Sequence, residues 1–297
     1  MIATKPKCQF PLSPEVSRNL FYRDRNRPLI RLRRIPVTIA IGFEFDGGLL
    51  FYADTKVTTT IKTNAEKIAH RAHDTEDLSL TFAMSSTDMN FPIMAVDTCW
   101  NYIKASNLQG ATIDTVHQYA QFSLGEFYRD HIYSHPDRTP GAVFLELLVG
   151  IRFRGETRLY VSHETVLNRV DQYESIGSGA YLAKYLIRQY QAAAPSRSLT
   201  DAAFIANFAV HAAIGYDEHC GGEARMLIVG NDGALSHAPA FDYPGTELVD
   251  GITGLTWKML HRLAQVEEKS GKDSDAEVER YCAEVRKLHD SLKWGRW

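Results

Sequence analysis

The apolar and polar positions of this chain follow strand-like and helix-like periods from residue 38 onward. Residues 38–45 and 49–54 are mostly apolar, and Asp46-Gly47-Gly48 separates them. This composition is typical of two antiparallel strands joined by a tight turn. Three further strand pairs are predicted, over 67–72 with 78–84, over 143–153 with 157–164, and around Asn231-Asp232-Gly233.

Helices are predicted between these strand pairs. Ile93, Val96, Trp100 and Ile103 recur at helical spacing, and Pro92 is tolerated in a first helical turn. Further helices are predicted after Thr112, after Gly177-Ser178-Gly179, after Ser198 with its capping partner Asp201, and in the charged C-terminal stretch. Hairpins followed by paired helices indicate antiparallel sheets covered by helices, an α+β fold.

The pattern after residue 38 contains no internal repeat and no linker. We therefore expect one domain over 38–240, followed by a helical extension over 241–297. Residues 1–37 differ, because they hold nine lysines and arginines, five prolines and no apolar period. We expect this segment to lie outside the fold, as an N-terminal extension.

Composition narrows the class of protein. With 297 residues and a net charge of −3, the chain lacks the basic balance that nucleic-acid binding needs. No run approaches the roughly 18 apolar residues of a membrane span, and the start has no apolar secretion segment. The four cysteines form no CxxC pair, which indicates a reduced, cytoplasmic setting.

Histidine pairs are the only metal-like spacings that we find. His70 with His73, and His131 with His135, could each supply two ligands. Neither pair has a convincing third ligand, so we expect no metal and no cofactor.

Three short segments carry candidate chemistry. The first is TIAIG at 38–42, continued by DGG at 46–48 and ADTK at 53–56. The second is GSG at 177–179, and the third is DEHCGG at 217–222, followed by a strand and a DG turn. Together they resemble the proteasome β-subunit family and its bacterial homologues over about 38–240. The resemblance implies a four-layer αββα sandwich, the fold of N-terminal-nucleophile (Ntn) hydrolases.

The resemblance also implies roles for particular residues. The nucleophile would be Thr38, supported by the acid Asp54 and by Lys67. Ser178 and Asp217 match the positions that support the terminal amine. Each residue also has a structural alternative, since Asp54 could begin a turn, Lys67 could lie on an exposed face and Ser178 could cap a helix.

The sequence departs from the family pattern at three places. Cys220 stands where the family usually has serine, and a thiol is the poorer hydrogen-bonding group. Asp217 and Cys220 could instead form a helix-ending turn. No oxyanion glycine follows the strand that ends near Met84, although a backbone N–H of Ser85 or Ser86 could serve. Val37, rather than glycine, precedes Thr38.

An N-terminal threonine suits this chemistry because it carries its own base. The hydroxyl is a poor nucleophile alone, but a free α-amine with a pKa near 8 accepts its proton. The β-branch of Thr38 restricts the direction of its Oγ. A cation at Lys67 would favour deprotonation of both groups, and Asp54 would hold it in place. The turn at 46–48 returns Asp54 close to Thr38.

Residues 1–37 are incompatible with this chemistry while they are attached to Thr38. The segment is a propeptide, or the protein is a noncatalytic relative, or translation begins at Val37. We favour the third explanation, because valine can be encoded by the start codon GTG. Arg33-Arg34 can be written AGGAGG, a ribosome-binding sequence at a suitable distance.

The sequence thus predicts a threonine-type hydrolase of amide bonds, in particular a peptidase. The alternatives are a noncatalytic proteasome-like assembly subunit and a small-molecule amidase on the same fold. A ring or other homo-oligomer is expected, and no activating ATPase is specified. Its contacts are expected on two helices, through Ile93, Val96, Trp100, Phe204, Ile205 and Phe208.

Overall fold

The computed structural model describes residues 38–58, 62–134, 144–237, 245–265 and 271–291. The extension expected over 1–37 lies outside these residues. So does the end of the expected C-terminal extension, residues 292–297.

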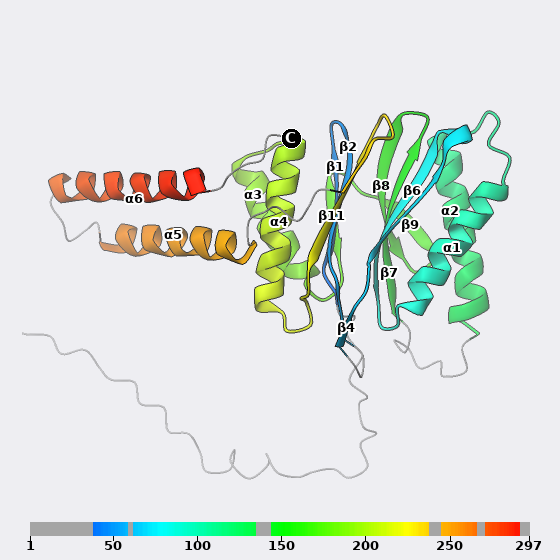
Figure 1. The fold of residues 1–297 in the computed structure, drawn as a ribbon, viewed down its shortest axis with the longest axis horizontal. Helices are drawn as coiled ribbons and strands as arrows, with labels where there is room; N and C mark the ends of the chain where they lie inside the picture. Colours follow the sequence, from blue (N-terminus) through cyan, green and yellow to red (C-terminus); the bar gives the residue numbers. More distant parts are fainter. Residues whose placement is uncertain (1–37, 59–61, 135–143, 238–244, 266–270, 292–297) are drawn as a thin grey trace, which may run out of the picture. The chain divides into compact units, whose positions relative to one another are not determined.

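Two five-stranded antiparallel sheets form the centre of the molecule (Figure 1). The sheet that carries Thr38 has the strand order β10 (Tyr173–Ile176), β1 (Ala40–Phe45), β2 (Gly48–Asp54), β11 (Ala224–Gly230) and β12 (Leu235–Ser236). The second sheet has the order β5 (Ile68–His73), β6 (Leu78–Ser86), β7 (Leu145–Phe153), β8 (Glu156–His163) and β9 (Val166–Arg169). A separate two-stranded ribbon consists of β3 (Lys56–Thr58) and β4 (Lys62–Asn64).

Helix pairs cover the outer faces of both sheets. The covering helices are α1 (Asn90–Ala105) and α2 (Ile113–Phe127) on the second sheet, and α3 (Ala180–Ala193) and α4 (Leu199–Tyr216) on the first. The four-layer α+β sandwich expected from the sequence is therefore confirmed.

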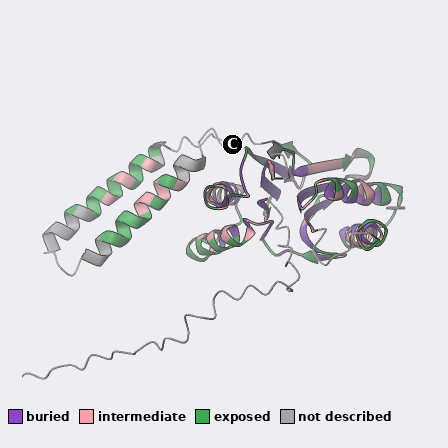
Figure 2. Cartoon of the chain, turned by 90° about the horizontal axis from the view of Figure 1, so that it is seen from below, coloured by how far each residue is buried: buried purple, intermediate pink, exposed green. Residues whose placement is uncertain are grey.

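Three apolar clusters correspond to the three interfaces between the four layers. One joins α1 and α2 to the second sheet, one joins α3 and α4 to the first sheet, and one fills the space between the sheets. Both faces of each sheet are thus covered, as the mostly buried strands of Figure 2 show. This explains why the inner strands β1, β2 and β7 are mostly apolar instead of alternating regularly with polar residues.

The alternation of side chains along β1 decides which face each residue occupies. Ile39 and Ile41 pack toward α3 and α4, whereas Ala40 packs between the two sheets. Because successive side chains point to opposite faces, Thr38 shares the inter-sheet side with Ala40. The nucleophile candidate therefore faces the second sheet.

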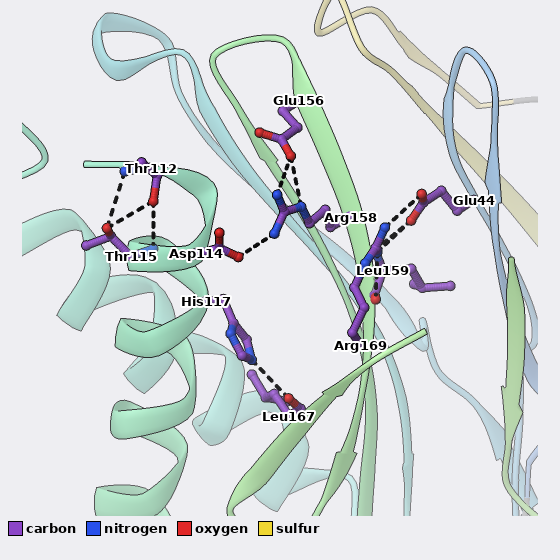
Figure 3. Close-up of polar contacts among 10 residues, drawn as sticks. All are labelled: Glu44, Thr112, Asp114, Thr115, His117, Glu156, Arg158, Leu159, Leu167 and Arg169. Atoms are coloured by element: carbon purple, nitrogen blue, oxygen red, sulfur yellow. Dashed lines mark hydrogen bonds and ion pairs between the residues drawn. The ribbon is translucent and has the colours of Figure 1, made fainter. Parts of the chain in front are cut away.

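Polar contacts fix α2 on the second sheet (Figure 3). Thr112 caps the helix, as its side chain accepts a hydrogen bond from the Thr115 N–H. His117 bonds the carbonyl of Leu167 on β9 at 2.9 Å, and the Asp114 carboxylate pairs with Arg158 on β8. These contacts anchor one helix to two neighbouring strands.

Glu44 joins the two sheets at the end of β1 farthest from Thr38. Its carboxylate pairs with Arg169 of β9 at 2.6 Å and accepts the backbone N–H of Leu159 at 3.3 Å. The spacing between the sheets is therefore fixed by polar contacts as well as by the apolar cluster between them.

Of the helical residues expected to contact other subunits, some are buried in the core and others are at least partly exposed. Val96 and Ile205 are buried against their own sheets and belong to the core. Ile93 is 46% exposed, while Phe204 and Phe208 are half-buried. The intramolecular core accounts for the two buried residues, so they are removed from the expected interface.

Two helices follow the sandwich, α5 (Gly245–Gln265) and α6 (Gly271–Ser291). They contact each other through an ion pair between Lys258 and Glu284 at 2.7 Å and through the approach of Leu288 to Gly251. Among the helices that the structure describes, none is long and apolar enough to cross a membrane.

Candidate active site

Thr38 lies immediately before β1, where the turn after β10 holds its backbone. The Thr38 N–H donates to Ser178 Oγ at 3.4 Å. The Thr38 carbonyl accepts the Ser178 hydroxyl at 3.3 Å and the Gly179 N–H at 3.2 Å. Both polar backbone groups of Thr38 are thus bonded to GSG, the second of the three segments.

Gly177 allows this close approach of the turn to Thr38. Its φ is +91°, and a Cβ at this position would lie 2.3 Å from the Thr38 carbonyl oxygen. Only glycine adopts this conformation readily and leaves the space that Thr38 occupies.

Asp54 lies at the end of β2, beside Thr38, because the β1–β2 hairpin pairs Ala40 with Ala53. Its Oδ1 accepts the Thr38 hydroxyl at 3.4 Å and the Ile39 N–H at 3.1 Å. The hairpin turn therefore returns the carboxylate to the candidate nucleophile, as its length predicted.

Lys67 and Asp54 form an ion pair that is fully shielded from solvent. The Lys67 Nζ lies 2.7 Å from Asp54 Oδ1 and also bonds the carbonyl of Lys56. Burial lowers the pKa of Lys67 and raises the pKa of Asp54, while their mutual attraction opposes both changes. Lys67 is therefore not on an exposed face.

The loop after α4 completes the support of Asp54. The Gly221 N–H donates to Asp54 Oδ2 at 2.9 Å. The Lys56 ammonium donates hydrogen bonds to the carbonyl of Glu218, at 2.5 Å, and to the carbonyl of Cys220, at 3.2 Å. These two hydrogen bonds fix the loop that contains the third segment, and no pattern in the sequence indicates this role of Lys56.

Asp217 organises the same loop from the C-terminus of α4. Its carboxylate accepts the His219 N–H at 2.9 Å and the Cys220 thiol at 3.5 Å. Partial burial alone raises the pKa of Asp217, but hydrogen bonds from Ser178, His219 and Cys220 together lower it below its ordinary value.

Cys220 is a buried thiol in contact with Ser178. Its Sγ lies 3.7 Å from Ser178 Oγ, and burial, helped by the charge of Asp54, raises the pKa of Cys220 to about 12. A thiol with such a pKa is not a thiolate at neutral pH, so Cys220 cannot compete with Thr38 as a nucleophile.

The hydrogen bonds of β6 show the direction of the two backbone N–H groups considered as oxyanion donors, those of Ser85 and Ser86. Thr87 N–H donates to the Phe144 carbonyl at 3.1 Å, and Ser85 pairs with Glu146 two positions away. Bonded and non-bonded pairs alternate in an antiparallel ladder. The Ser85 N–H is therefore directed toward β7 and is part of the ladder.

The neighbouring N–H groups of β6 point the other way. Met84 N–H donates to the Lys67 carbonyl at 2.9 Å. Ser86, two residues on, has the same orientation and lies beyond Lys67 along the strand. Of the two backbone donors that the sequence left open, Ser86 is the one directed toward the Lys67 side.

All six residues selected from the sequence thus lie in one connected cluster. Thr38 bonds Asp54 and Ser178, Asp54 bonds Lys67, and Ser178 contacts the loop of Asp217 and Cys220.

The histidine pairs belong to other contacts. His70 bonds Thr81 at 2.8 Å and His73 bonds Thr75 at 2.9 Å, while His135 lies outside the described residues. Within the described part of the chain, no group of three or more metal-binding side chains is found.

Comparisons with known proteins give only structural matches. No family model and no curated protein matches this sequence. A mutant of Anbu from Hyphomicrobium sp. strain MC1 superposes with a TM-score of 0.61 at 14% identity, covering 78% of this chain and 99% of that one. Anbu from Yersinia bercovieri, described as the ancestral β-subunit, gives 0.60 at 14%, covering 79% and 100%.

A third similar structure is a helical assembly of the Anbu complex from Pseudomonas aeruginosa. Its TM-score is 0.57 at 12% identity, covering 76% of this chain and 96% of that one. Identities this low establish the fold alone, an α+β sandwich of the Ntn type.

These findings correct the family inferred from the sequence. The assignment to the proteasome β-subunit family is wrong, because no family model supports it and the similar structures are Anbu proteins. The three segments that carried the assignment are only a few residues each, and such short motifs do not distinguish one family from another.

Proposed function

We propose that this protein is an Ntn hydrolase that cleaves amide bonds with Thr38 as its nucleophile. The observation that carries the proposal is the buried chain of contacts from Thr38 through Asp54 to Lys67. Burial of an ion pair costs desolvation free energy, and a purely structural role beside a hydroxyl does not require that cost.

The first step is attack of the Thr38 Oγ on the substrate carbonyl carbon. The hydroxyl proton passes to the α-amine of Thr38 and then to the leaving nitrogen as the C–N bond breaks. An ester between Thr38 and the acyl group results. Water, deprotonated by the same amine, attacks the ester, which releases a carboxylic acid and restores the Thr38 hydroxyl.

Lys67 tunes this proton transfer. The cation of Lys67 favours loss of a proton from the Thr38 hydroxyl and from the α-ammonium of Thr38. The Asp54 carboxylate holds the Lys67 side chain in place at a distance of 2.7 Å. The Ser86 N–H is the proposed donor to the oxyanion of the tetrahedral intermediate, where one backbone donor contributes about 100-fold or more to the rate.

Ser178, Asp217 and Cys220 support the α-amine. Ser178 Oγ accepts the Thr38 N–H, and its hydroxyl is in turn connected to Asp217 and to the Cys220 thiol. A lowered pKa keeps Asp217 ionised at neutral pH, which stabilises an ammonium that forms on Thr38.

The mechanism requires Thr38 to be the N-terminal residue, because an amide nitrogen is not a base. We propose that residues 1–37 are absent from the active protein, either because translation begins at codon 37 or because the segment is removed. The domain then covers 38–240, with 241–297 as a helical extension.

We propose a peptide or protein substrate and a homo-oligomer. The Anbu complex from Pseudomonas aeruginosa forms a helical assembly, which supports association of the present chain with copies of itself. A noncatalytic assembly subunit and a small-molecule amidase are the competing functions on this fold.

One experiment separates these functions. A chain that begins at Thr38 contains every strand and helix that the structure describes, and it is tested for turnover of a fluorogenic peptide panel and for labelling by a peptide vinyl sulfone. Turnover that Thr38→Ala abolishes supports the peptidase. Labelling of Thr38 without peptide turnover indicates an amidase, and neither activity indicates an assembly subunit.

A further inference from the structure

Glu146 is a charged residue in a strand whose other positions near it are apolar. It lies on β7 between Leu145 and Leu147, which pack into the cluster under α1 and α2. Leu148, two residues on, packs between the sheets. Because side chains alternate along a strand, Glu146 points into the inter-sheet space, on the side that Thr38 faces.

Glu146 differs from Arg152, the other charged residue of β7. Arg152 forms an ion pair with Asp77 at 2.6 Å, so its partner explains its position. Across the described ranges, no ion pair within 4.0 Å involves Glu146. The Glu146 Oε2 atom accepts a hydrogen bond from the Gly177 N–H at 3.1 Å. Burial raises the pKa of Glu146 above its ordinary value.

The Gly177 N–H belongs to the turn that holds Thr38. This turn contacts the Thr38 carbonyl through Ser178 and Gly179 and provides the acceptor for the Thr38 N–H. Glu146 therefore ties the turn after β10, in the first sheet, to β7 in the second sheet.

The same strand β7 pairs with β6, which carries the proposed oxyanion donor. Ser85 lies directly opposite Glu146 in the ladder, and Ser86 follows it. The distance between the Thr38 amine and the Ser86 N–H thus depends on how the turn at 177–179 is held against β7.

We propose that Glu146 is a positioning residue that sets the turn carrying Ser178 at its working distance from the oxyanion donor. The inference rests on the proposed function and adds a residue that none of the three sequence segments contains. A carboxylate fits this task because a charged acceptor makes a stronger and shorter hydrogen bond than a neutral one.

Three variants of the chain beginning at Thr38 test the proposal. Glu146→Ala removes the acceptor, and a displaced nucleophile lowers kcat by about 100-fold with KM nearly unchanged. Glu146→Gln keeps an oxygen acceptor without its charge, and kcat recovers to within about tenfold of the parent. Glu156→Ala is the matched control, because Glu156 is an exposed residue of β8 that pairs with Phe153, at the end of β7 farthest from Glu146.

Hydrogen exchange of a peptide spanning 173–183 gives a readout that needs no activity, and it is measured on the full chain as well. Glu146→Ala should raise exchange at the Gly177 amide, and Glu146→Gln should raise it less. Unchanged exchange in Glu146→Ala overturns the proposal, as does a loss confined to KM. If the parent chain itself has no turnover, the proposed function fails, while the exchange result still decides the role of Glu146.

Discussion

The Lys67 ammonium lies 2.7 Å from the Asp54 carboxylate, and neither side chain is exposed to solvent. Desolvation of two charges costs several kcal/mol per ion, and one ion pair rarely offsets it completely. Asp54 therefore recruits further donors, the N–H groups of Ile39 and Gly221. These donors come from the residue before β1 and from the α4–β11 loop, so the pair depends on distant parts of the fold.

Removing one charge of this pair should harm stability and activity together. Lys67→Met leaves Asp54 buried without a cation, and unfolding free energy should fall by about 3–5 kcal/mol in urea titrations. Peptide turnover should fall by about 100-fold or more, because proton transfer from Thr38 loses the cation that favours it.

A double variant separates the two effects. Asp54→Asn with Lys67→Met leaves no buried charge, so most of the lost stability should return while turnover stays as low as in Lys67→Met. Turnover in the double variant close to that of the parent would show that the pair is only structural.

Gly177 makes a second prediction, about shape instead of charge. Gly177→Ala forces a Cβ to within 2.3 Å of the Thr38 carbonyl oxygen and keeps a φ of +91°, which costs about 1–3 kcal/mol of backbone strain even before the clash. We expect a lower melting temperature and almost no labelling of Thr38 by the vinyl sulfone.

Gly125→Ala is the control for that substitution. Gly125 lies in α2, and a Cβ there meets no atom within 4 Å. The change should stabilise the helix by about 0.5–1 kcal/mol and leave labelling intact. Equal labelling in both variants would mean that the turn at 177–179 does not position Thr38.

The sequence predicted the hairpins because their turns have distinctive residues. Asp46-Gly47-Gly48 and Asn231-Asp232-Gly233 mark the β1–β2 and β11–β12 connections, and both pairs are present. The strand β10 has no such signal, since Tyr173–Ile176 is short and pairs with β1 across more than 120 positions. That pairing brings Ser178 to Thr38, so only the short GSG motif indicated this part of the site.

Other parts of the site could not be predicted from local pattern. Lys56 acts through an ammonium that bonds the carbonyls of a distant loop, and Glu146 acts through one backbone N–H. Neither contact has a sequence period. For Glu146 a signal did exist, a carboxylate within an apolar strand, because a half-buried charge needs a partner to be stable.

Asp217 gives a pH-dependent prediction. Its pKa is lowered in the folded protein, so the folded state releases this proton more readily than the unfolded state. The carboxylate therefore contributes stability above its unfolded pKa of about 3.9, and that contribution is lost as pH falls through the lower folded pKa.

Asp217→Asn should consequently lower the melting temperature most at neutral pH. The difference from the parent should shrink as the pH falls below about 4. Thermal melts between neutral and acidic pH measure it, with Asp250→Asn, an exposed position of α5, as control. A difference in melting temperature that does not change with pH would show that the charge of Asp217 does not stabilise the fold.

The N-terminus of the active protein should be Thr38. Because valine precedes Thr38 where self-processing families have glycine, we expect initiation at codon 37 followed by removal of methionine. Reading this codon tests the initiation route, and any valine codon other than GTG excludes it. Intact mass of protein purified from its source tests the mechanism itself, since an active enzyme that retains residues 1–37 would contradict it.

Assembly gives the last prediction, and the outer helices supply the surfaces. Phe122 on α2 is 54% exposed and its ring centroid lies 5.3 Å from that of Tyr102 on α1, with the two rings tilted, while Tyr181 on α3 is 86% exposed. Apolar and aromatic side chains of this kind are enriched in stable interfaces.

A ring or helical assembly needs two unlike surfaces on each subunit, whereas a closed dimer needs one. Phe122→Asp and Tyr181→Asp should therefore each shift light-scattering mass toward smaller species, while Glu126→Ala, a half-buried charged neighbour of Phe122 on α2, should not. If only one of the two aspartate variants has an effect, the assembly is a closed dimer, and a parent chain that is monomeric at micromolar concentration excludes the homo-oligomer.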